Sequence, residues 1–502
     1  MFKNLKIFLS KNKKIINNNL SSKKFILIAD RLRFDSCIRQ SLISKFFNEK
    51  GYMPILATQK PNSIYHKVYK SFGCEKTFDT SMSSNKKFFF IHFFSFFFKT
   101  ILIILKHSMT NFETFRSDLK IAGVRYGDQI LDQYLRNHNY EKGIVTFKFF
   151  KMILISHFKI NLIKKFIIKK KIKYTVVSTD SYINDSSVIW RVSENLKIKC
   201  IMSAKKTIKV YSLTREYNEQ FHIIKNEDLE KIKPYSKVKR YLKKRFQGKI
   251  DHIDVKNAYS RKTRTLSRKD FLNFFRLNKT KFRKIILFAP HVFADSCGAD
   301  GRFPFLNYYN FFTETYNRIK EIKDIFWIIR PHPGRYMWNE DNLIKNLMGK
   351  NKSKNIFLCP DKLSTKDLLD HVDTVVTGRG TIGIEAAIFG KKPLTCGHSI
   401  YSDIDFTNNA KTKKEFFKKL KFEDLSFTLS KKEIVKAEKA LYFMGAYRWD
   451  NNSKIIPNIK TDKNIRKLNF YFALLNKNLM SKNFLEDDYY FDLKKKLDPY
   501  IN

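Results

Sequence analysis

The sequence predicts an α/β fold with more than one doubly wound domain, and three observations lead to this prediction. Short apolar runs of about four to eight residues recur along the chain with helical stretches between them, which is typical of buried strands in a parallel sheet. Several of these runs end in a polar turn marked by Gly or Pro. The length of 502 residues is sufficient for two or three domains of about 100–200 residues each.

The first predicted domain covers residues 24–280 and follows a basic, Asn-rich lead-in over residues 1–23. Its expected elements in chain order are a strand over residues 25–30, a helix over 35–50, strands over 53–57 and 173–178, a helix over 184–196 and a strand over 199–203. This alternation is that of a doubly wound sheet. Residues 205–249 are expected to be mainly helical and very basic. The polar, charged stretch over 255–283 indicates a domain boundary near residue 280.

The second predicted domain, over residues 281–430, contains three apolar runs that we expect to be buried strands. They lie at residues 285–289, 326–329 and 374–376. Polar residues follow each run, and the carboxyl ends of the strands are where open α/β sheets bind their ligands. Helices are expected over residues 431–502, where Pro457 interrupts the helical pattern.

Composition indicates a folded chain with a large positive charge. Hydrophobic residues make up 43% and aromatic residues 15% of the chain, so a sizeable core can form. Lys and Arg total 98 against 47 acidic residues, a formal net charge of +51. The basic residues are mostly Lys spread among Phe, Ile and Asn, which favours a biased coding composition over a specific nucleic-acid binder. Such a charge still attracts anionic membranes and substrates.

The cysteines indicate neither a disulfide framework nor a zinc site. None of the six forms a CxxC pair, and they suit a reducing cytoplasm. They are Cys37, Cys74, Cys200, Cys297, Cys359 and Cys396. The N-terminal segment begins with basic residues, but its apolar core is too short for a signal peptide and no cleavage site of small residues follows it, so we expect none.

Two apolar stretches are candidates for membrane contact. Residues 88–105 (FFFIHFFSFFFKTILIIL) reach the lower length for a spanning helix, about 18 residues. His92 and Lys99 interrupt this stretch, and a Lys at the bilayer centre costs about 3 kcal/mol. Residues 149–168 contain four lysines. We therefore expect buried or interfacial helices rather than membrane spans.

The strongest local signal is the glycine-rich segment Thr377–Pro393 (TGRGTIGIEAAIFGKKP). Gly378 and Gly380 permit a sharp turn after a strand, and a helix is expected to begin near Thr381. The unpaired N–H groups of a helix N-terminus suit a phosphate or diphosphate. Glu385 lies one turn further on, where a carboxylate can accept hydrogen bonds from ribose hydroxyls. A plain strand–loop–helix with a glycine-rich turn is the alternative.

The second signal is Arg330-Pro331-His332-Pro333, directly after a predicted strand. The two prolines restrict the backbone on both sides of His332 and so fix how it is presented. A His in such a frame can donate to a phosphate, and Arg330 can pair with one. A lone His is more often structural, and only the proline frame favours a site. The candidate binding residues are Arg330, His332, Thr377, Gly378, Gly380, Thr381 and Glu385.

Four further residues are candidates for catalysis. His291 and Asp295 follow a predicted strand with a spacing that can bring imidazole and carboxylate into contact, whereas a metal site lacks a third ligand. Asp128 lies where a helix is expected to begin, and Asp180 follows another predicted strand. Either carboxylate suits a helix cap as well as a site. Neither an HExxH, a GxSxG nor a Walker A pattern is present, which argues against a zinc protease, an α/β-hydrolase and a P-loop enzyme.

These segments resemble a known family. The second half of the chain is similar to the nucleotide-sugar-binding domain of GT-B glycosyltransferases, in particular to capsule and surface-polysaccharide biosynthesis proteins related to bacterial Kdo transferases and sialyltransferases. The resemblance is scattered over roughly residues 115–460. The segments that carry it are GVRYGDQILDQYLR, YLKKRFQGK, APHVFADS, RPHP, TGRGTIGIEAAIFGKKPL and CGHSIYSDIDFT.

The resemblance implies a GT-B-like fold, with two Rossmann-like domains facing a cleft and C-terminal helices. It implies a metal-independent glycosyltransferase without a cofactor, which uses a nucleotide-sugar donor, a CMP-linked sugar being one option. By this resemblance, His332 and the turn Gly380–Thr381 hold the donor phosphate and Glu385 lies near the ribose. Asp128 or Asp180 would act as base or nucleophile toward the acceptor.

The same resemblance implies a partner and a location. The acceptor would be a lipid-linked capsule or lipopolysaccharide glycan, and the protein would be cytoplasmic and peripheral at the anionic inner membrane. Two features depart from the related families: the turn Gly378–Thr381 lacks their paired Ser, and no Asp-Tyr-Ser-Ser stretch is present. Two alternatives stay open. One is a sugar-nucleotide 2-epimerase of the same architecture, and the other is a non-catalytic, basic RNA- or membrane-binding scaffold.

Overall fold

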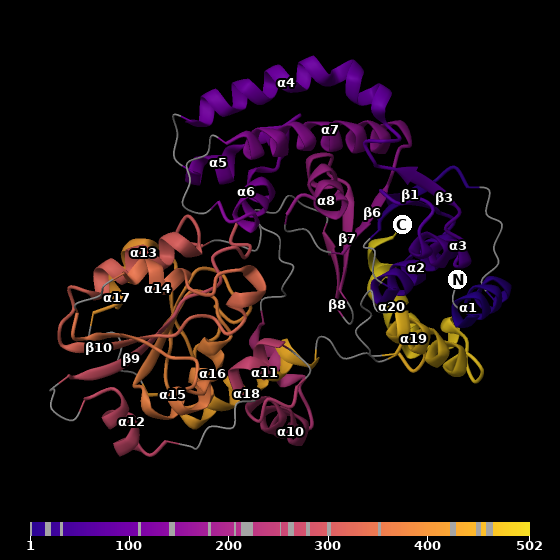
Figure 1. Ribbon diagram of the computed structural model, residues 1–502. Coiled ribbons are helices and arrows are strands. Elements are labelled where there is room, and N and C mark those ends of the chain that lie inside the picture. The colour runs from indigo at the N-terminus through magenta and orange to yellow at the C-terminus, as the bar shows by residue number, and fades with distance from the viewer. Residues whose placement is uncertain are drawn as a thin grey trace. The chain divides into compact units, whose positions relative to one another are not determined.

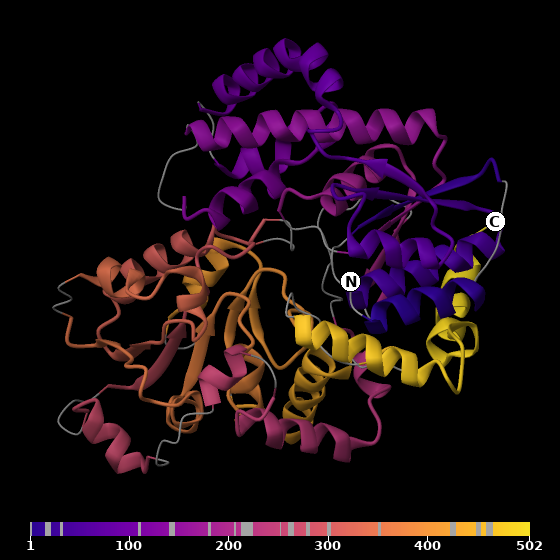
Figure 2. The ribbon, with the colours of Figure 1, turned by 45° about the vertical axis from the view of Figure 1, so that its right-hand side comes forward.

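The computed structural model of the chain divides into two compact units (Figures 1 and 2). Unit 1 comprises residues 1–133, 143–220 and 448–502, and unit 2 comprises residues 134–142 and 221–447. The residues that the structure describes are 3–15, 22–30, 34–108, 112–139, 146–178, 182–204, 207–211, 224–250, 253–259, 266–277, 282–298, 303–349, 353–421, 428–447, 453–457 and 465–501.

Unit 1 is built on a six-stranded sheet with the strand order β3-β2-β1-β6-β7-β8. Its strands are β1 (Phe25–Ala29), β2 (Met53–Thr58), β3 (Lys76–Asp79), β6 (Tyr174–Val177), β7 (Lys199–Ala204) and β8 (Thr207–Tyr211). All neighbours pair in parallel except β7 and β8, which are antiparallel. Numbered along the chain, the strands run 3-2-1-4-5-6, the order of a Rossmann-like sheet.

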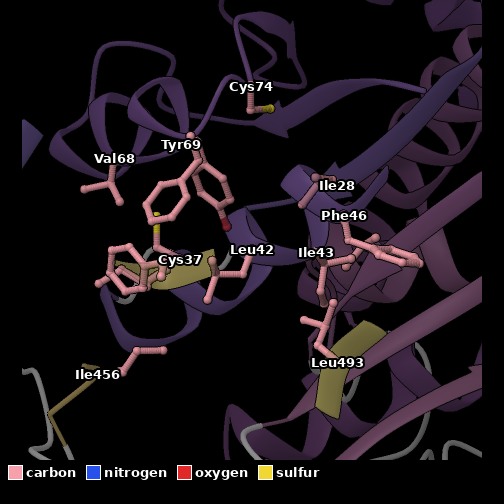
Figure 3. Packing of buried hydrophobic residues seen from close by; sticks show 14 of the residues in the cluster. Ile28, Cys37, Leu42, Ile43, Phe46, Val68, Tyr69, Cys74, Ile456 and Leu493 are labelled. Carbon is pink, nitrogen blue, oxygen red and sulfur yellow. The ribbon is translucent and has the colours of Figure 1, made fainter. Parts of the chain in front are cut away.

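Both ends of the chain contribute to the main core of unit 1. Figure 3 shows Ile28 of β1, Phe46 of α2 and Leu493 of α20 in this one cluster of buried side chains. Helix α1 packs on both α3 and α19. These helices are α1 (Lys3–Ile15), α2 (Phe34–Glu49), α3 (Ile64–Ser71), α19 (Ile465–Asn478) and α20 (Asp488–Leu497). The last segment of the chain therefore folds as part of the N-terminal domain.

A second group of helices in unit 1 packs on its sheet through α8, which contacts β1, β6 and β7. Asn184 caps α8, since its side chain accepts from the N–H of Ser187 over 3.0 Å. Helix α7 packs on α8, and α4 packs on α7. The elements of this group are α4 (Lys86–Ser108), α5 (Phe112–Asp118), β4 (Lys120–Ile121), β5 (Val124–Arg125), α6 (Gly127–Arg136, whose last turn belongs to unit 2), α7 (Phe147–Lys169) and α8 (Asp185–Asn195).

Unit 2 repeats the same sheet order, with β11-β10-β9-β12-β13-β14 all in parallel. The central strands are rich in β-branched, aromatic and leucine side chains, and β10 and β12 are buried along their full length, as expected for strands covered on both faces. The strands are β9 (Lys284–Ala289), β10 (Ile325–Ile329), β11 (Ile356–Leu358), β12 (Thr374–Thr377), β13 (Leu394–Cys396) and β14 (Asn408–Ala410).

The helices of unit 2 include a basic group that precedes its first strand. Phe271 and Phe275 pack in one core cluster with residues of β9 and β10, and Val238 and Leu242 pack with α18. The helices are α9 (Asn226–Glu230), α10 (Tyr235–Phe246), α11 (Ile253–Tyr259), α12 (Arg268–Phe274), α13 (Tyr308–Ile319), α14 (Leu343–Met348), α15 (Thr365–His371), α16 (Ile382–Ile388), α17 (Lys413–Lys419) and α18 (Lys431–Gly445).

The predicted α/β class with two Rossmann-like domains, GT-B-like in kind, is confirmed by the two sheets. The domain limits differ from those predicted. Helices α9–α12 belong to unit 2 rather than to a first domain ending near residue 280, and the predicted C-terminal helices are divided between the units. The lead-in contains helix α1, and β8 lies in a stretch predicted to be helical. The sequence did not reveal where these helices pack, because each has only a few apolar side chains among many lysines.

The apolar stretches are helices, as predicted, but they differ in burial. Helix α7 is largely buried, with Phe149, Ile153 and Ile163 among its enclosed side chains. In α4, only 11% of the most apolar 18-residue window is buried. Of the two options predicted for this helix, burial therefore does not hold, and the interfacial option stays a prediction.

We expect Leu493→Ala to destabilise unit 1 by about 2–5 kcal/mol, because a buried leucine is replaced by a cavity. Leu493 of α20 is 1% exposed. Hydrogen exchange of the β1 and β2 amides measures this unit specifically. Phe491→Ala, in the same helix but with a side chain that is 58% exposed, is the matched control and is expected to change protection far less. Equal effects of the two substitutions would contradict the packing of α20 into this core.

Candidate functional site

The candidate site of unit 2 lies at the carboxyl ends of three adjacent strands. Strand β9 pairs on one side with β10 and on the other with β12, so the strand order reverses beside β9. His291 follows β9, His332 follows β10 and the turn Gly378–Thr381 follows β12. Open α/β sheets bind ligands at such a reversal. The structure thus brings together the polar rim that the sequence predicted.

Two histidines meet on this rim. The ring centroids of His291 and His332 lie 5.5 Å apart, and those of His291 and Tyr308 lie 4.4 Å apart in a stacked arrangement. The N–H of Gly334 donates to Nδ1 of His332 over 3.1 Å. In the neutral ring, this bond places the proton on Nε2, which can then donate to an anion. The local geometry agrees with the predicted phosphate role of His332, which stays a prediction.

A tyrosine that the sequence did not single out holds the glycine turn in place. Tyr401 is buried and donates to the carbonyl of Gly380 over 2.5 Å. Gly383 in α16 leaves room for this hydroxyl, because a Cβ there would lie 2.5 Å from it. Thr377 donates to the carbonyl of Ala289 over 2.8 Å and ties the end of β12 to that of β9. Thr377, one of the predicted binding residues, therefore makes a structural contact between two strands.

The rest of the turn becomes more exposed toward the start of α16. Thr381 is exposed and makes no side-chain capping bond to the described part of that helix. Gly378 is buried, and a Cβ there would lie 3.2 Å from the ring of Phe303. The backbone of this turn is thus held close to its neighbours on one side. Phosphate binding by Gly378, Gly380 and Thr381 stays a prediction.

Glu385 is committed to a buried ion pair. Its Oε1 accepts from Arg245 Nη2 over 2.6 Å and from Nε over 2.9 Å, and its Oε2 accepts from Tyr259 over 2.5 Å. Burial alone would lower the pKa of Arg245, but the carboxylate of Glu385 raises it above its ordinary value. Arg245 lies in the YLKKRFQGK segment and Tyr259 in α11. This geometry ties α10 and α11 to α16, and the predicted contact of Glu385 with ribose stays untested.

Arg330 is likewise turned away from the rim. The guanidinium donates to the carbonyls of Pro360 and Leu363 over 2.8 and 2.9 Å, and the side chain is buried. It therefore supports the loop after β11. A phosphate role for Arg330 stays a prediction, but the structure assigns this guanidinium to the backbone.

The loop that carries His291 and Asp295 rests on a buried glutamate that the sequence did not reveal. Glu340 accepts from the N–H groups of Phe293 and Ala294 over 2.9 and 2.8 Å. The pKa of Glu340 is raised to about 7, because burial and, to a smaller extent, the charge of Asp295 outweigh the two N–H groups, which lower it. His291 Nδ1 lies 3.7 Å from an oxygen of Asp295. The predicted approach of these two side chains is present, while their catalytic role is untested.

The candidate carboxylates of unit 1 have separate outcomes. Asp180 lies outside the described residues. Asp128 is buried at the start of α6 and forms an ion pair with the equally buried Arg191. Arg191 also pairs with Glu194 over 2.8 Å. This placement agrees with the structural alternative for Asp128, since a buried charge requires a partner.

A different carboxylate occupies the strand ends of unit 1. Asp185, the first residue of α8, accepts from Lys159 over 2.7 Å, from Gln59 over 2.9 Å and from Thr80 over 2.5 Å. Gln59 follows β2, and Thr80 follows β3. Sequence reasoning missed this site because an Asp at a helix start is commonly a cap.

The described residues contain no group of three or more His, Cys, Asp or Glu side chains placed to hold a metal ion. The six cysteines are all buried and unpaired with one another. Metal independence stays a prediction.

Part of the chain matches a known family. The family of capsule polysaccharide biosynthesis proteins matches residues 197–440. These residues include β9–β14, the rim histidines, the glycine turn and Tyr401. The predicted resemblance to capsule polysaccharide biosynthesis proteins is confirmed over this range. No curated protein sequence matches the chain.

Several solved structures are similar to this chain at low identity. A beta Kdo 2,4 transferase, KpsC from Thermosulfurimonas dismutans, has 14% identity and a TM-score of 0.32, covering 53% of this chain and 79% of that chain. A UDP-GlcNAc 2-epimerase from Methanocaldococcus jannaschii has 11% identity and a TM-score of 0.24, covering 84% and 99%. A glycosyltransferase from Rickettsia africae has 10% identity and a TM-score of 0.24, covering 94% and 99%. Similarity at this level does not distinguish between their activities.

We expect Gly383→Ala to destabilise unit 2 by about 1–3 kcal/mol, because the new methyl group would overlap the hydroxyl of Tyr401. Tyr401→Phe alone should cost about 1 kcal/mol through the lost bond to Gly380. The double variant should be more stable than the sum of the single effects predicts, since Phe removes the overlapping atom. Chemical denaturation measures all three, and strict additivity would contradict the contact.

We expect Glu340 to make the stability of unit 2 depend on pH. Because burial raises its pKa from 4.5 to about 7, the contribution of Glu340 to stability is fully present below pH 4.5 and is lost as the pH rises through 7. The expected change is on the order of 3 kcal/mol. Glu340→Gln should remove this component of the unfolding free energy between pH 4.5 and 8. Glu321→Gln, at an exposed position, should leave the pH dependence unchanged.

Proposed function

We propose that this chain is a glycosyltransferase of capsule polysaccharide biosynthesis, which transfers a sugar from a nucleotide-sugar donor to a growing surface glycan. The observation that carries the proposal is the family match over residues 197–440. It falls on the part of the chain that contains the rim of β9, β10 and β12. The ends of these strands are the place where a Rossmann-like sheet holds a nucleotide.

The donor is proposed to bind on this rim through its phosphates. His332 supports this because its Nδ1 accepts from Gly334, so its Nε2–H can donate to a phosphate oxygen. The Gly380 turn supports it because its backbone conformation is held by Tyr401 and does not need to be ordered on binding. Hydrogen bonds of this kind would stabilise the nucleotide phosphate as it leaves. A metal ion is not required in this proposal.

The acceptor hydroxyl must lose a proton as it attacks the sugar, and a carboxylate or imidazole suits that step. Asp180 and the pair His291 and Asp295 remain the proposed candidates. Asp128 is the weaker candidate, because Arg191 already neutralises its buried carboxylate. In this proposal, Asp185 and its hydrogen-bond partners stabilise unit 1 and do not accept the proton.

The acceptor is proposed to be a lipid-linked glycan at the cytoplasmic face of the inner membrane. The net charge of +51 supports this, since it attracts an anionic membrane and an anionic glycan. The protein would then be cytoplasmic and peripheral. The donor could carry CMP, UDP or GDP, and a CMP-linked sugar would match a Kdo-type transfer.

The proposal predicts that one of CMP, UDP, GDP and CDP stabilises the protein in a thermal-shift assay, with EDTA present throughout. Saturation to 100 times Kd adds about 2.7 kcal/mol of stability. His332→Ala should weaken the binding of that nucleotide at least tenfold, since a hydrogen bond to a charged group contributes about 1.5–3 kcal/mol. His92→Ala, on α4 of unit 1, is the control and should bind as the wild type does.

The outcomes separate the donor classes. A response to CMP would indicate a Kdo- or sialic-acid-type donor, and a response to UDP or GDP a hexose donor. Turnover of a nucleotide sugar that depends on an added glycan acceptor would distinguish transfer from 2-epimerisation, which needs no acceptor. If no nucleotide stabilises the wild type, the transferase proposal fails and the scaffold alternative gains support.

A further inference from the structure

Helix α4 presents an apolar stripe on its outer side. In Figure 1 it lies along α7, and it also contacts the short helix α5. The stripe residues recur every three or four positions, which places them on one face of the helix. We call them the α4 face: Phe90, Ile91, Phe94, Phe98, Leu102 and Leu105, each between 59% and 71% exposed. Monomeric soluble proteins rarely expose an apolar patch of this kind.

The opposite side of α4 attaches the helix to unit 1. The ring centroids of Phe96 and His157 of α7 lie 5.7 Å apart, and those of Phe89 and Phe158 also lie 5.7 Å apart. Thr100 is fully buried on the same side. The exposure of the stripe is therefore not caused by poor packing of the whole helix, because the inner face of α4 is packed on α7.

Charge distinguishes between the partners that could cover the α4 face. Neither Lys86–Ser108 nor Phe147–Lys169 contains an acidic residue. Exposed lysines of α4 occur at both ends of the stripe and beside it, and exposed lysines of α7 lie on the neighbouring helix. They are Lys86, Lys87, Lys99, Lys106, Lys148, Lys151, Lys165 and Lys169. Helix α5, which also contacts α4, places Asp118 near His107 at one end of the stripe. An apolar stripe with a mainly cationic border complements an anionic lipid surface.

We propose that the α4 face docks on an anionic lipid bilayer with the helix axis parallel to the membrane plane. The phenylalanines and leucines would enter the boundary between headgroups and acyl chains, and the lysines would meet lipid phosphates. This inference deepens the proposed function, on which it rests for its purpose, because it names the surface that would bring unit 1 to a lipid-linked acceptor.

Two other arrangements fit the same helix less well. Helix α4 is long and apolar enough to cross a membrane by length and composition, but crossing would expose its inner side, including Thr100 and the rings that pack on α7, and would bury Lys99. A second copy of the chain would bring two lysine borders together, and like charges repel.

Vesicle flotation of the full chain tests the proposal. We expect the wild type to float with vesicles of phosphatidylglycerol and phosphatidylethanolamine, to bind phosphatidylcholine at least tenfold more weakly, and to lose affinity as salt is raised. The triple variant Phe90→Ser, Phe94→Ser and Phe98→Ser should bind at least tenfold more weakly than the wild type. The control is Phe491→Ser. Phe491 lies on α20 and is likewise exposed, at 58%, and this variant should float as the wild type does. Equal flotation of all three proteins would overturn the proposal.

The depth of the helix is measured separately. The native cysteines are all buried, so Phe94→Cys and Leu105→Cys can each be labelled selectively with an environment-sensitive fluorophore. Docking in the plane predicts a blue shift at both positions and release of the protein by alkaline carbonate. A protein that resists carbonate extraction would indicate a membrane span, and a dimer without lipid binding would indicate a second copy as the partner. Either result would overturn the proposal.

The failure of this inference can be told apart from failure of the proposed function. The nucleotide thermal shift is measured without lipid, and the triple variant should keep it because its substitutions lie on α4 of unit 1. A nucleotide response without vesicle binding would reject only the docking surface. Vesicle binding that depends on the α4 face without any nucleotide response would reject only the transferase.

Discussion

The pairing of β9 with both β10 and β12 is the constraint on which the candidate site depends. Parallel strands present all their carboxyl ends at one edge of the sheet, and the reversal of strand order beside β9 opens that edge between neighbouring loops. Segments separated by some ninety residues in the sequence, from His291 to Thr381, therefore come together. The hydrophobic side chains of β9, β10 and β12 require this arrangement, since they are buried on both faces.

Several of the polar residues predicted for the site already have buried partners within the protein. Glu385 pairs with Arg245, Asp128 pairs with Arg191, and Arg330 donates to backbone carbonyls. Each group would be strongly destabilising without its partner, because the protein interior solvates charge poorly. The two ion pairs also join helices to one another, α10 to α16 and α6 to α8. The side chains that stay partly exposed on the rim of unit 2 include His291, His332 and Thr381, and these carry the chemical hypotheses.

The two units differ in how their outer layers end. Unit 2 covers its sheet with helices α9–α18, and many of their apolar side chains pack in buried clusters. Unit 1 adds α7 over α8 and then α4 over α7, and this last layer ends in exposed phenylalanine and leucine. An added helix stabilises a fold only through its inner side, so the outward stripe of α4 requires a separate explanation, such as a lipid surface.

The sequence by itself determined the central strands of both sheets, the glycine turn and the proline-framed His332, because each depends on local patterns of two to ten residues. The apolar runs that became β1, β2, β9 and β10 were predicted within one or two residues, and so was the start of α8. Only the tertiary structure decided which unit α9–α12 and α19–α20 join, and which polar side chains are paired. The contacts of Arg245, Glu340, Tyr401 and Asp185 could not be predicted from the sequence, since their partners lie far away along the chain. Long-range pairing of buried polar groups depends on the packed geometry, which no local pattern encodes.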